Sequence, residues 1–453
     1  MTQPSFIRRE GVDYLRNFFR YSLYDKARGQ YLLTLDDGSY IFLDTFSFQQ
    51  LKRGVIKDAA LFDRLENTGV VITSESLPFV VAKTQERYQF LMNGTSLHII
   101  VPTIRCNQSC PYCFASPKHI TDDPEANDMT EETAKKTIEF IMQSPSSAAT
   151  LEFTGGEATI RFDLVKLMTN YARELNQYYQ KDLKVTIVTN LSMMNDEMAD
   201  WLIDNDVTIC TSLDGPQHVH DYNRIIKPTP HKELGSHRSV AYWIERINDK
   251  YRERGMERGV NALMTITRYA LPYYKEIIDE YIRLGLSVVY IRPLTLVGRA
   301  SERKSAHNWY PREEFITFYE HCLQYLEELR QQGYHIEDVM TEQFRQKIIE
   351  QQPTYNVDYE SPWGAGTGAA AYNHDGSVYA CHEAVDKEEF LLGNVFDDTW
   401  DDMFRRREAA FTVLSSMLEQ DVLSDRSPFK PYGGSNPLEL LTAFGKLHVH
   451  PSK

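Results

Sequence analysis

The sequence has few cysteines, no long apolar run and no excess of basic residues. Only six of its 453 residues are cysteine, far from the density of small disulfide-stapled domains. The sequence has no run of about 18 apolar residues, so it predicts no transmembrane helix. Its 49 Lys and Arg against 64 Asp and Glu give a formal net charge of −15. This balance argues against broad phosphate-backbone binding, and nucleic acid is not expected as a partner.

The chain has the composition of a folded protein with several units. Apolar residues make up 42% and aromatic residues 12%, which excludes intrinsic disorder as a class. At roughly 100–200 residues per domain, the length predicts two to four folding units. The first residues, MTQPSFIRREGVDYL, lack the apolar stretch of a signal peptide. We therefore expect a cytoplasmic protein with no membrane partner.

Residues 93–300 alternate short apolar runs with helical stretches. The expected strands are SLHIIVPTI, TLEFTG, KVTIVTN, VTICTSLDG, GVNALMTIT and LSVVYIRP. The expected helices between them are EETAKKTIEFIMQ, LVKLMTNYARELNQYY, MADWLIDN and PYYKEIIDEYIRLG. Six such repeats predict an α/β fold, a partial (β/α)6 barrel of the TIM type. In such barrels, functional residues lie in the loops after the strands.

Smaller units flank this region. In residues 1–92, YLLTLDDGSYIFL reads as a hairpin around Asp36-Asp37-Gly38, followed by two amphipathic helices, the second closed by Gly69. This pattern predicts a small winged-helix-like domain. Residues 301–360 are expected to form a helical connector. In residues 361–453, AAAYNHDGSVYAC predicts a second hairpin, followed by a loop-like tail after residue 420.

Three of the six cysteines form a cluster directly after the first barrel strand. Cys106, Cys110 and Cys113 lie in RCNQSCPYCF with C-x3-C-x2-C spacing. A structural zinc site usually needs four ligands, and the spacing does not indicate a fourth, although Cys381 or a histidine could supply one. An iron–sulfur cluster held by three thiolates would keep one iron open for another ligand. We favour iron–sulfur over zinc and over three unrelated buried thiols.

At these residues the sequence resembles the radical S-adenosylmethionine enzymes, with Tyr112 as the aromatic residue before the last cysteine. The resemblance implies one [4Fe-4S] cluster on the three cysteines, whose open iron binds S-adenosylmethionine. In this family, reductive cleavage of that cofactor gives a 5′-deoxyadenosyl radical that abstracts hydrogen from a substrate. An external electron donor is implied as well.

Further motifs follow the next strands. Thr154-Gly155-Gly156-Glu157 comes after the second strand, Thr189-Asn190 after the third, and Ser212 after the fourth. Two glycines permit close backbone approach, and a carboxylate can receive an ammonium group. The resemblance implies that Gly155, Gly156 and Glu157 hold the methionine moiety, and that Thr189, Asn190 and Ser212 surround the rest of the cofactor. It also implies an arginine on the cofactor carboxylate.

Two arginines are candidates for that role, Arg224 and Arg238, and the sequence does not decide between them. Arg292, at the end of the sixth strand, is expected either to face a carboxylate ligand or to form a structural ion pair. Cys210 and Cys322 are expected to be packed thiols. The terminal His448 and His450 are expected to be exposed.

The run SLDGP, with His220-Asp221 and Arg224 after it, resembles the sulfatase-maturase-like branch of the family, and residues 361–453 resemble its SPASM or twitch extension. Such extensions bind auxiliary clusters through further cysteines. Here only Cys381 matches, as a plain thiol or with a substrate or redox role left open. Residues that are poor cluster ligands occupy the remaining positions of the tail: Ser424, Ser427, Gly433 and Asn436. We interpret the extension as degenerate and predict a single cluster.

The layout of the whole chain most resembles the maturase of the His-Xaa-Ser peptide system. That resemblance implies modification of a ribosomally made precursor peptide, whose leader the N-terminal domain would bind as an added strand. Two alternatives remain: the same chemistry on a small molecule, or a non-catalytic scaffold that binds a leader peptide.

Overall fold

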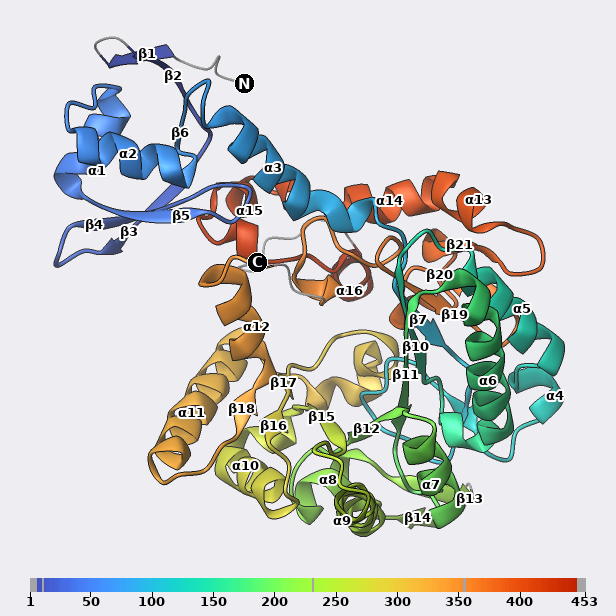
Figure 1. Ribbon diagram of the computed structural model, residues 1–453. Coiled ribbons are helices and arrows are strands. Elements are labelled where there is room, and N and C mark those ends of the chain that lie inside the picture. Colours follow the sequence, from blue (N-terminus) through green and yellow to red (C-terminus); the bar gives the residue numbers. More distant parts are fainter. Residues whose placement is uncertain (1–5, 10–11, 230–231, 353–355, 446–453) are drawn as a thin grey trace.

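The computed structural model describes residues 6–9, 12–229, 232–352 and 356–445. Its central feature is a curved sheet with helices on its outer face (Figure 1). Six parallel strands form the barrel part: β7 (Leu97–Ile100), β10 (Ala148–Phe153), β11 (Asp182–Thr189), β12 (Thr208–Ser212), β15 (Asn261–Thr265) and β17 (Ile291–Arg292). They lie side by side in chain order. The expected partial (β/α)6 barrel is confirmed.

The strands bury one face against the helices and turn the other toward the barrel interior. In β10, Leu151 and Phe153 are completely buried in the main core, while Thr150 and Glu152 on the opposite face are partly accessible. This alternation follows from the two-residue period of a strand. Leu151 lies opposite Val185 of β11, so the apolar faces of both strands meet the same helical layer.

Five longer helices cover the outer face: α5 (Glu131–Met142), α6 (Phe162–Tyr179), α7 (Asp196–Asp204), α9 (His237–Glu253) and α10 (Tyr274–Arg283). Two begin at side-chain caps, because Thr130 accepts a hydrogen bond from Thr133 N and Asn195 accepts one from Met198 N. Four of the five helices match expected stretches, whereas α9 is a helix that we did not expect.

The C-terminal segment extends the same sheet. Strand β19 (Ala369–Tyr372) pairs in parallel with β7, and β20 (Ser377–Tyr379) and β21 (Leu391–Asn394) follow in antiparallel order. The hairpin expected around YNHDGSVY is confirmed. The expectation of a loop-like tail after residue 420 was wrong in two places, where the structure has α15 (Val422–Arg426) and α16 (Pro437–Phe444). Helix α16 begins at Asn436, whose side chain accepts hydrogen bonds from two backbone amides. Asn-Pro at a helix start is a capping signal in its own right.

The N-terminal residues form a separate core. Strands β3 (Arg20–Asp25), β4 (Gln30–Thr34) and β5 (Tyr40–Asp44) make an antiparallel sheet against α1 (Thr45–Arg53) and α2 (Ala59–Thr68). The expected hairpin and both helices are confirmed, including Gly69 as a left-handed C-cap. A second small sheet was not expected and contains β1 (Phe6–Arg9), β2 (Val12–Arg16) and β6 (Val71–Ile72).

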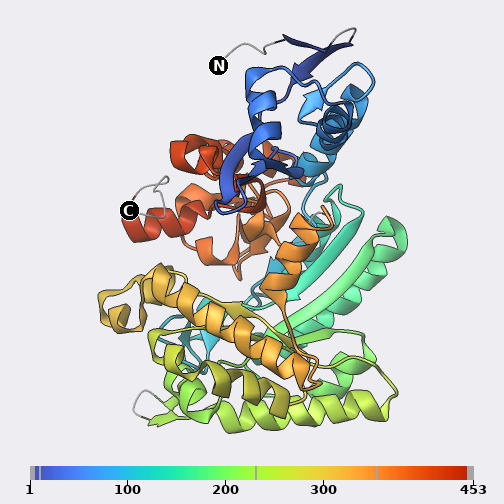
Figure 2. The same ribbon diagram turned by 90° about the vertical axis from the view of Figure 1, so that its left-hand side faces the viewer.

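Helix α3 (Leu77–Tyr88) runs from this N-terminal unit to the barrel. The expected helices between barrel and extension are present as α11 (Arg312–Gln331) and α12 (Val339–Ile348). Figure 2 shows the N-terminal unit above the barrel, with the C-terminal segment beside both. None of the helices in the described ranges is long and apolar enough to cross a membrane. His448 and His450 lie outside the described residues.

Candidate active site at the cysteine loop

The three clustered cysteines lie in the loop after β7, at the edge where the barrel strands end. Cys106 belongs to β8 (Arg105–Cys106), which pairs with β9 (Lys118–His119). Cys106 and Cys110 are buried and Cys113 is half-buried. Because the barrel strands are parallel, the loops after β10, β11 and β12 meet at the same edge.

A buried ion pair fixes the start of the cysteine loop. The Arg105 guanidinium donates to both carboxylate oxygens of Asp128, with Nε 2.8 Å from Oδ1 and Nη2 2.6 Å from Oδ2. The Thr103 hydroxyl donates to the same carboxylate at 2.5 Å. A paired and hydrogen-bonded arginine of this kind restrains both its own side chain and the backbone that carries it.

The two glycines after β10 bring their backbone directly against the cysteine loop. Gly156 N donates to Thr103 O and Glu157 N donates to Arg105 O, each at 2.9 Å. Gly155 has a φ of 111°, and a Cβ there would lie 2.5 Å from Thr103 O. A Cβ on Gly156 would collide with the carbonyl of Arg105. The glycines are therefore required for contact within the chain, in addition to any contact with a ligand.

Glu157 joins the end of β10 to the end of β11. Its carboxylate is almost completely buried, at 2% exposure for the residue. Oε1 accepts from the Thr189 hydroxyl at 2.6 Å and from both the hydroxyl and the amide of Thr159, and Oε2 accepts from Asn190 N at 2.8 Å. A carboxylate oxygen has two lone pairs, so Oε2 retains capacity for one more donor.

Asn190 extends this network to the first cysteine. Its side-chain amide nitrogen lies 3.9 Å from Cys106 Sγ and donates to Asn107 Oδ1 at 3.0 Å. Gln108 N donates to the same sulfur at 3.3 Å. The Gln108 N–H lowers the pKa of the Cys106 thiol, but burial outweighs it and raises that pKa overall.

A second network joins the cysteine loop to the end of β12. The Tyr112 hydroxyl donates to Asp214 Oδ2 at 2.5 Å, and Arg224 Nη2 donates to Asp214 Oδ1 at 3.0 Å. The guanidinium carbon of Arg224 lies 5.4 Å from the centre of the Tyr112 ring. Burial alone would lower the pKa of Arg224, but the surrounding groups, Asp214 first among them, together raise that pKa. Arg224 therefore remains charged inside the site.

The remaining predicted residues occupy different surroundings. Ser212 is half-buried at the end of β12, opposite Leu263 of β15. Arg238 is exposed in the first turn of α9. Of the two candidate arginines, the structure places Arg224 against the cysteine loop and Arg238 on the surface.

Arg299 is a site residue that the sequence analysis missed. Its backbone N–H donates to Cys113 O at 2.9 Å, and its guanidinium donates to the Ser109 hydroxyl at 3.1 Å and to Pro117 O at 2.8 Å. A Cβ on the preceding Gly298, whose φ is 58°, would collide with the Phe114 carbonyl. The only local signal was a Gly-Arg pair in a loop after the last barrel strand.

The donor set fits a cluster better than a single metal ion. Burial raises the pKa of the Cys106 and Cys113 thiols, and raises that of Cys110 to about 12. Each ligand thiol must lose its proton, so a positively charged partner is needed. In the described part of the chain, no three His, Cys, Asp or Glu side chains converge closely enough for one ion. A four-iron cluster binds each thiolate on a different iron, which spreads the sulfurs apart.

Residues 100–280 match the family model of the radical SAM superfamily. By this match, the barrel part of the chain is similar to a radical SAM domain. Relatives include an uncharacterized protein of Methanocaldococcus jannaschii, 23% identical over 199 residues that cover 44% of this chain and 63% of that protein. Another is the cysteine-type anaerobic sulfatase-maturating enzyme of Clostridium perfringens, 25% identical over 29% of this chain and 36% of the enzyme. The alignments with the first archaeal relatives thus span just under two thirds of their lengths.

Solved structures share the fold over a longer part of the chain. The structure of anSMEcpe with bound AdoMet has a TM-score of 0.62 at 17% identity, covering 75% of this chain and 88% of that one. SuiB of Streptococcus suis, bound to the precursor peptide SuiA, has a TM-score of 0.56 at 12% identity, covering 94% and 96%. At these identities the likeness concerns the fold alone.

The three cysteines outside the radical SAM loop are all buried. Cys210 lies inside β12 and Cys322 inside α11, as expected of packed thiols. Cys381 follows β20, and the neighbouring His382 ring packs edge-on against Phe114, 4.9 Å between ring centres. The C-terminal segment therefore contacts the cysteine loop of the radical SAM domain through its side chains.

Proposed function

We propose that the chain is a radical S-adenosylmethionine enzyme that modifies a ribosomally made peptide by hydrogen abstraction. The observation that carries this proposal is that the ends of β10, β11 and β12 meet the loop after β7, which contains the three thiols. Glu157 and Asn190 approach Cys106 from β10 and β11, and Asp214 approaches the cysteine loop from β12. Such a site, at the carboxyl ends of parallel strands, is where barrel enzymes place their chemistry.

Each residue has a defined task in this proposal. Cys106, Cys110 and Cys113 hold one [4Fe-4S] cluster. When bound, the cluster and S-adenosylmethionine supply one-electron cleavage of a carbon–sulfur bond, which yields a 5′-deoxyadenosyl radical. Gly155 and Gly156 keep the strand-end loop against the cysteine loop, and Glu157 receives the ammonium of the methionine moiety on Oε2.

The remaining contacts to the cofactor are assigned to polar groups on the neighbouring strand ends. Thr189 and Asn190 hold Glu157 in place through their hydrogen bonds. Ser212 and Arg224 are proposed to face the cofactor carboxylate, with Arg238 as the less favoured alternative because it is exposed. Tyr112 supports Asp214 and thereby the orientation of Arg224.

The N-terminal unit supports a peptide substrate. Strand β3 is the edge of its three-stranded sheet and carries exposed apolar side chains: Tyr21, Leu23 and Tyr24 are 43%, 44% and 60% exposed. An edge strand with exposed apolar groups can accept an extended peptide as an added strand. Similar folds have been solved with peptides, SuiB with its precursor SuiA and anSMEcpe with the Kp18Cys peptide.

Within the family, we propose the branch of the His-Xaa-Ser maturases with a degenerate SPASM-like extension. The extension keeps its β19–β20 hairpin but has Ser424, Ser427, Gly433 and Asn436 at the expected ligand spacing. Asn436 instead caps α16. A single cluster then requires an external electron donor.

Anaerobic reconstitution with iron and sulfide tests the proposal. We expect about four irons per chain, as one cluster requires, and release of 5′-deoxyadenosine when dithionite and S-adenosylmethionine are added. The triple variant with Cys106, Cys110 and Cys113 changed to Ala is the control and should do neither. Bound zinc without 5′-deoxyadenosine would overturn the radical chemistry and leave the scaffold alternative.

A second measurement tests the substrate. A short peptide encoded beside this gene, incubated with the reconstituted enzyme, should show a mass change that depends on S-adenosylmethionine. Release of 5′-deoxyadenosine that such a peptide does not stimulate, but a small molecule does, would favour the small-molecule alternative.

A further inference from the structure

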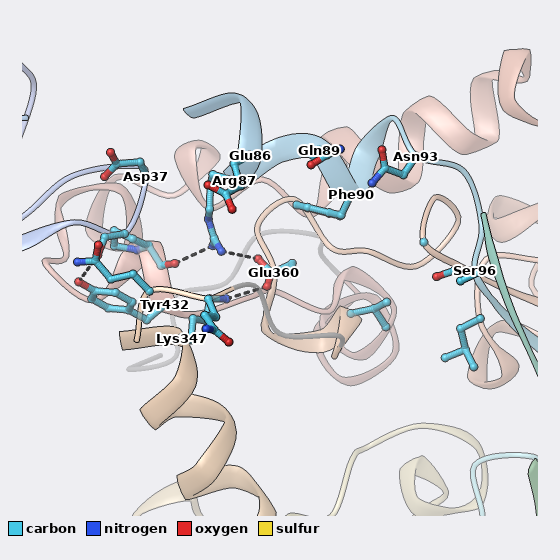
Figure 3. A pocket seen from close by; sticks show the side chains of 18 of the residues that line it. Asp37, Glu86, Arg87, Gln89, Phe90, Asn93, Ser96, Lys347, Glu360 and Tyr432 are labelled. Atoms are coloured by element: carbon cyan, nitrogen blue, oxygen red, sulfur yellow. Dashed lines mark hydrogen bonds and ion pairs between the residues drawn. The ribbon is translucent and has the colours of Figure 1, made fainter. Parts of the chain in front are cut away.

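A pocket of about 600 Å³ lies where the N-terminal unit, the barrel and the C-terminal segment meet. Its walls come from α3, from α12, from the β4–β5 turn and from the first residues of β7, β10 and β11. Figure 3 shows α3 above it and α12 below. The pocket is therefore at the opposite ends of the barrel strands from the cysteine loop. Its volume falls within the range of about 300–1,000 Å³ typical of ligand sites.

One wall of the pocket holds a buried group of three charged side chains. Arg87 on α3 and Lys347 on α12 both point toward Glu360 (Figure 3). Arg87 Nη1 lies 2.9 Å from Glu360 Oε2, and Lys347 Nζ lies 3.2 Å from Glu360 Oε1. The side chains of Arg87, Lys347 and Glu360 are only 11%, 3% and 6% exposed. Two cations thus share one carboxylate at a site with little solvent exposure.

This group has one positive charge in excess. Buried charges are costly unless they are paired, and here burial and the Arg87 charge lower the pKa of Lys347 to about 8. Both cations also donate to backbone carbonyls, Arg87 to Pro431 and Lys347 to Tyr359. Carbonyls carry no net charge, so the excess remains.

Among the described residues, the pocket's other carboxylates form no ion pair with Arg87 or Lys347. Asp37 accepts a hydrogen bond from Ser39 N at 2.8 Å, Asp182 pairs with Lys184 at 3.3 Å, and Glu86 is exposed. Lys83, one turn before Arg87 on α3, adds a further cation and donates to the Ser39 hydroxyl and to the side chain of Gln351. A ligand carboxylate would complete the charge balance at Arg87 and Lys347.

We propose that this pocket binds an acidic segment of the peptide substrate, with a carboxylate that pairs with Arg87 and Lys347 alongside Glu360. The inference rests on the proposed function for the identity of the ligand. Its position supports a peptide, because the pocket adjoins the β4–β5 turn of the N-terminal unit on one side and the barrel strands on the other. The pocket then selects peptides that carry Asp or Glu in that segment.

Isothermal titration of the full-length protein with an N-acetylated, C-amidated hexaglutamate peptide tests this inference. At low ionic strength we expect saturable binding, and hexaglutamine of the same length should bind at least about tenfold more weakly. Lys347→Gln and Arg87→Gln should each weaken hexaglutamate binding by about tenfold. Each variant leaves Glu360 with one cation, so a one-to-one buried pair remains and the fold should persist.

Two further variants distinguish binding at this specific site from nonspecific attraction between the acidic peptide and basic residues. Lys184→Gln removes a cation from the same pocket outside the group and should leave the affinity unchanged. Glu360→Gln removes the internal carboxylate and should tighten hexaglutamate binding, a gain that a merely structural ion pair would not produce. Binding that does not saturate, equal binding of hexaglutamine, or an equal loss in Lys184→Gln would overturn the site.

Free glutamate binding as tightly as hexaglutamate would overturn the peptide as ligand in favour of a small carboxylate. The titration needs neither the cluster nor S-adenosylmethionine. A failed titration would therefore not contradict the proposed radical chemistry. Absence of 5′-deoxyadenosine release would not contradict the titration result.

Discussion

Asp214 and Arg224 form a buried ion pair beside the cysteine loop, with 3.0 Å between Oδ1 and Nη2. The Asp214 side chain is fully buried and that of Arg224 is 11% exposed. Tyr112, between Cys110 and Cys113, donates to the other oxygen of the same carboxylate. Asp214 and Arg224 are ten residues apart in the sequence, and the hydrogen bond from Tyr112 of the cysteine loop fixes the carboxylate that pairs with the guanidinium.

Arg224→Ala should reduce 5′-deoxyadenosine release by at least about tenfold, because the cofactor carboxylate would lose the guanidinium partner that we propose for it. The change also leaves Asp214 buried without a cation, which should lower the free energy of unfolding by about 3–5 kcal/mol. Arg238→Ala, with its side chain on the surface, is the matched control and should change neither quantity measurably. Urea unfolding and quantified 5′-deoxyadenosine check the two effects. A loss in Arg238→Ala equal to that in Arg224→Ala would contradict the assignment.

Gly156→Ala should displace the cysteine loop, because the added Cβ meets the carbonyl of Arg105. Overpacking of this kind typically costs about 1–3 kcal/mol, and here the strain falls on the residue before Cys106. We expect iron incorporation well below that of the wild-type protein together with a lower melting temperature. Gly433→Ala is the control, since a Cβ there meets nothing within 4 Å. Wild-type iron content in Gly156→Ala would show that the loop can move without consequence.

The barrel was predictable from sequence because its strands lie in short apolar runs that alternate with amphipathic helical stretches. Helix α9 was missed although Val240, Ile244, Ile247 and Tyr251 repeat at helical spacing along it and are buried. Its first residue follows Ser236, which makes no side-chain cap, and charged residues dominate the rest of the helix. The spacing of the apolar residues indicates a helix, but the sequence does not show where this helix begins and ends.

The site was only partly predictable for a different reason. The cysteine spacing and the GGE motif are local patterns, so a single sequence shows them. Arg299 contacts Cys113 and Ser109, which precede it by more than 180 residues. The sequence around Arg299 contains no motif that predicts these contacts. In the group of Arg87, Lys347 and Glu360, Arg87 is likewise far from the other two in the chain, and only the fold brings them together.

Cys381→Ala should leave the iron content of the reconstituted protein unchanged, since one cluster on three other cysteines is expected. A second cluster would need further thiolates beside Cys381, and the tail has Ser424, Ser427, Gly433 and Asn436 at the ligand spacing. Cys106→Ala should reduce iron to a small fraction. Iron analysis and the visible absorption of the cluster check both variants. A loss of iron in Cys381→Ala would place a second cluster in the C-terminal segment.

His98 should make the folded protein less stable as the pH falls. It is fully buried in β7, where Nδ1 lies 2.9 Å from the Tyr372 hydroxyl of β19, and burial lowers its pKa to about 3. In the unfolded chain the pKa returns to about 6.5. Between these values the unfolded state binds more protons, so stability is lost as the pH drops through that window, by up to about 1.4 kcal/mol per pH unit.

The variant His98→Gln removes this titration and should show a shallower loss of stability between pH 6.5 and pH 4, measured by urea unfolding. Burial also lowers the pKa of His220 to about 3, but His220 is present in both proteins and its effect cancels in the difference. His335→Gln changes an exposed histidine and should follow the wild-type pH dependence. Parallel curves for wild type and His98→Gln would mean that the barrel admits a charged histidine at the β7–β19 junction, and that this junction opens before the rest of the sheet.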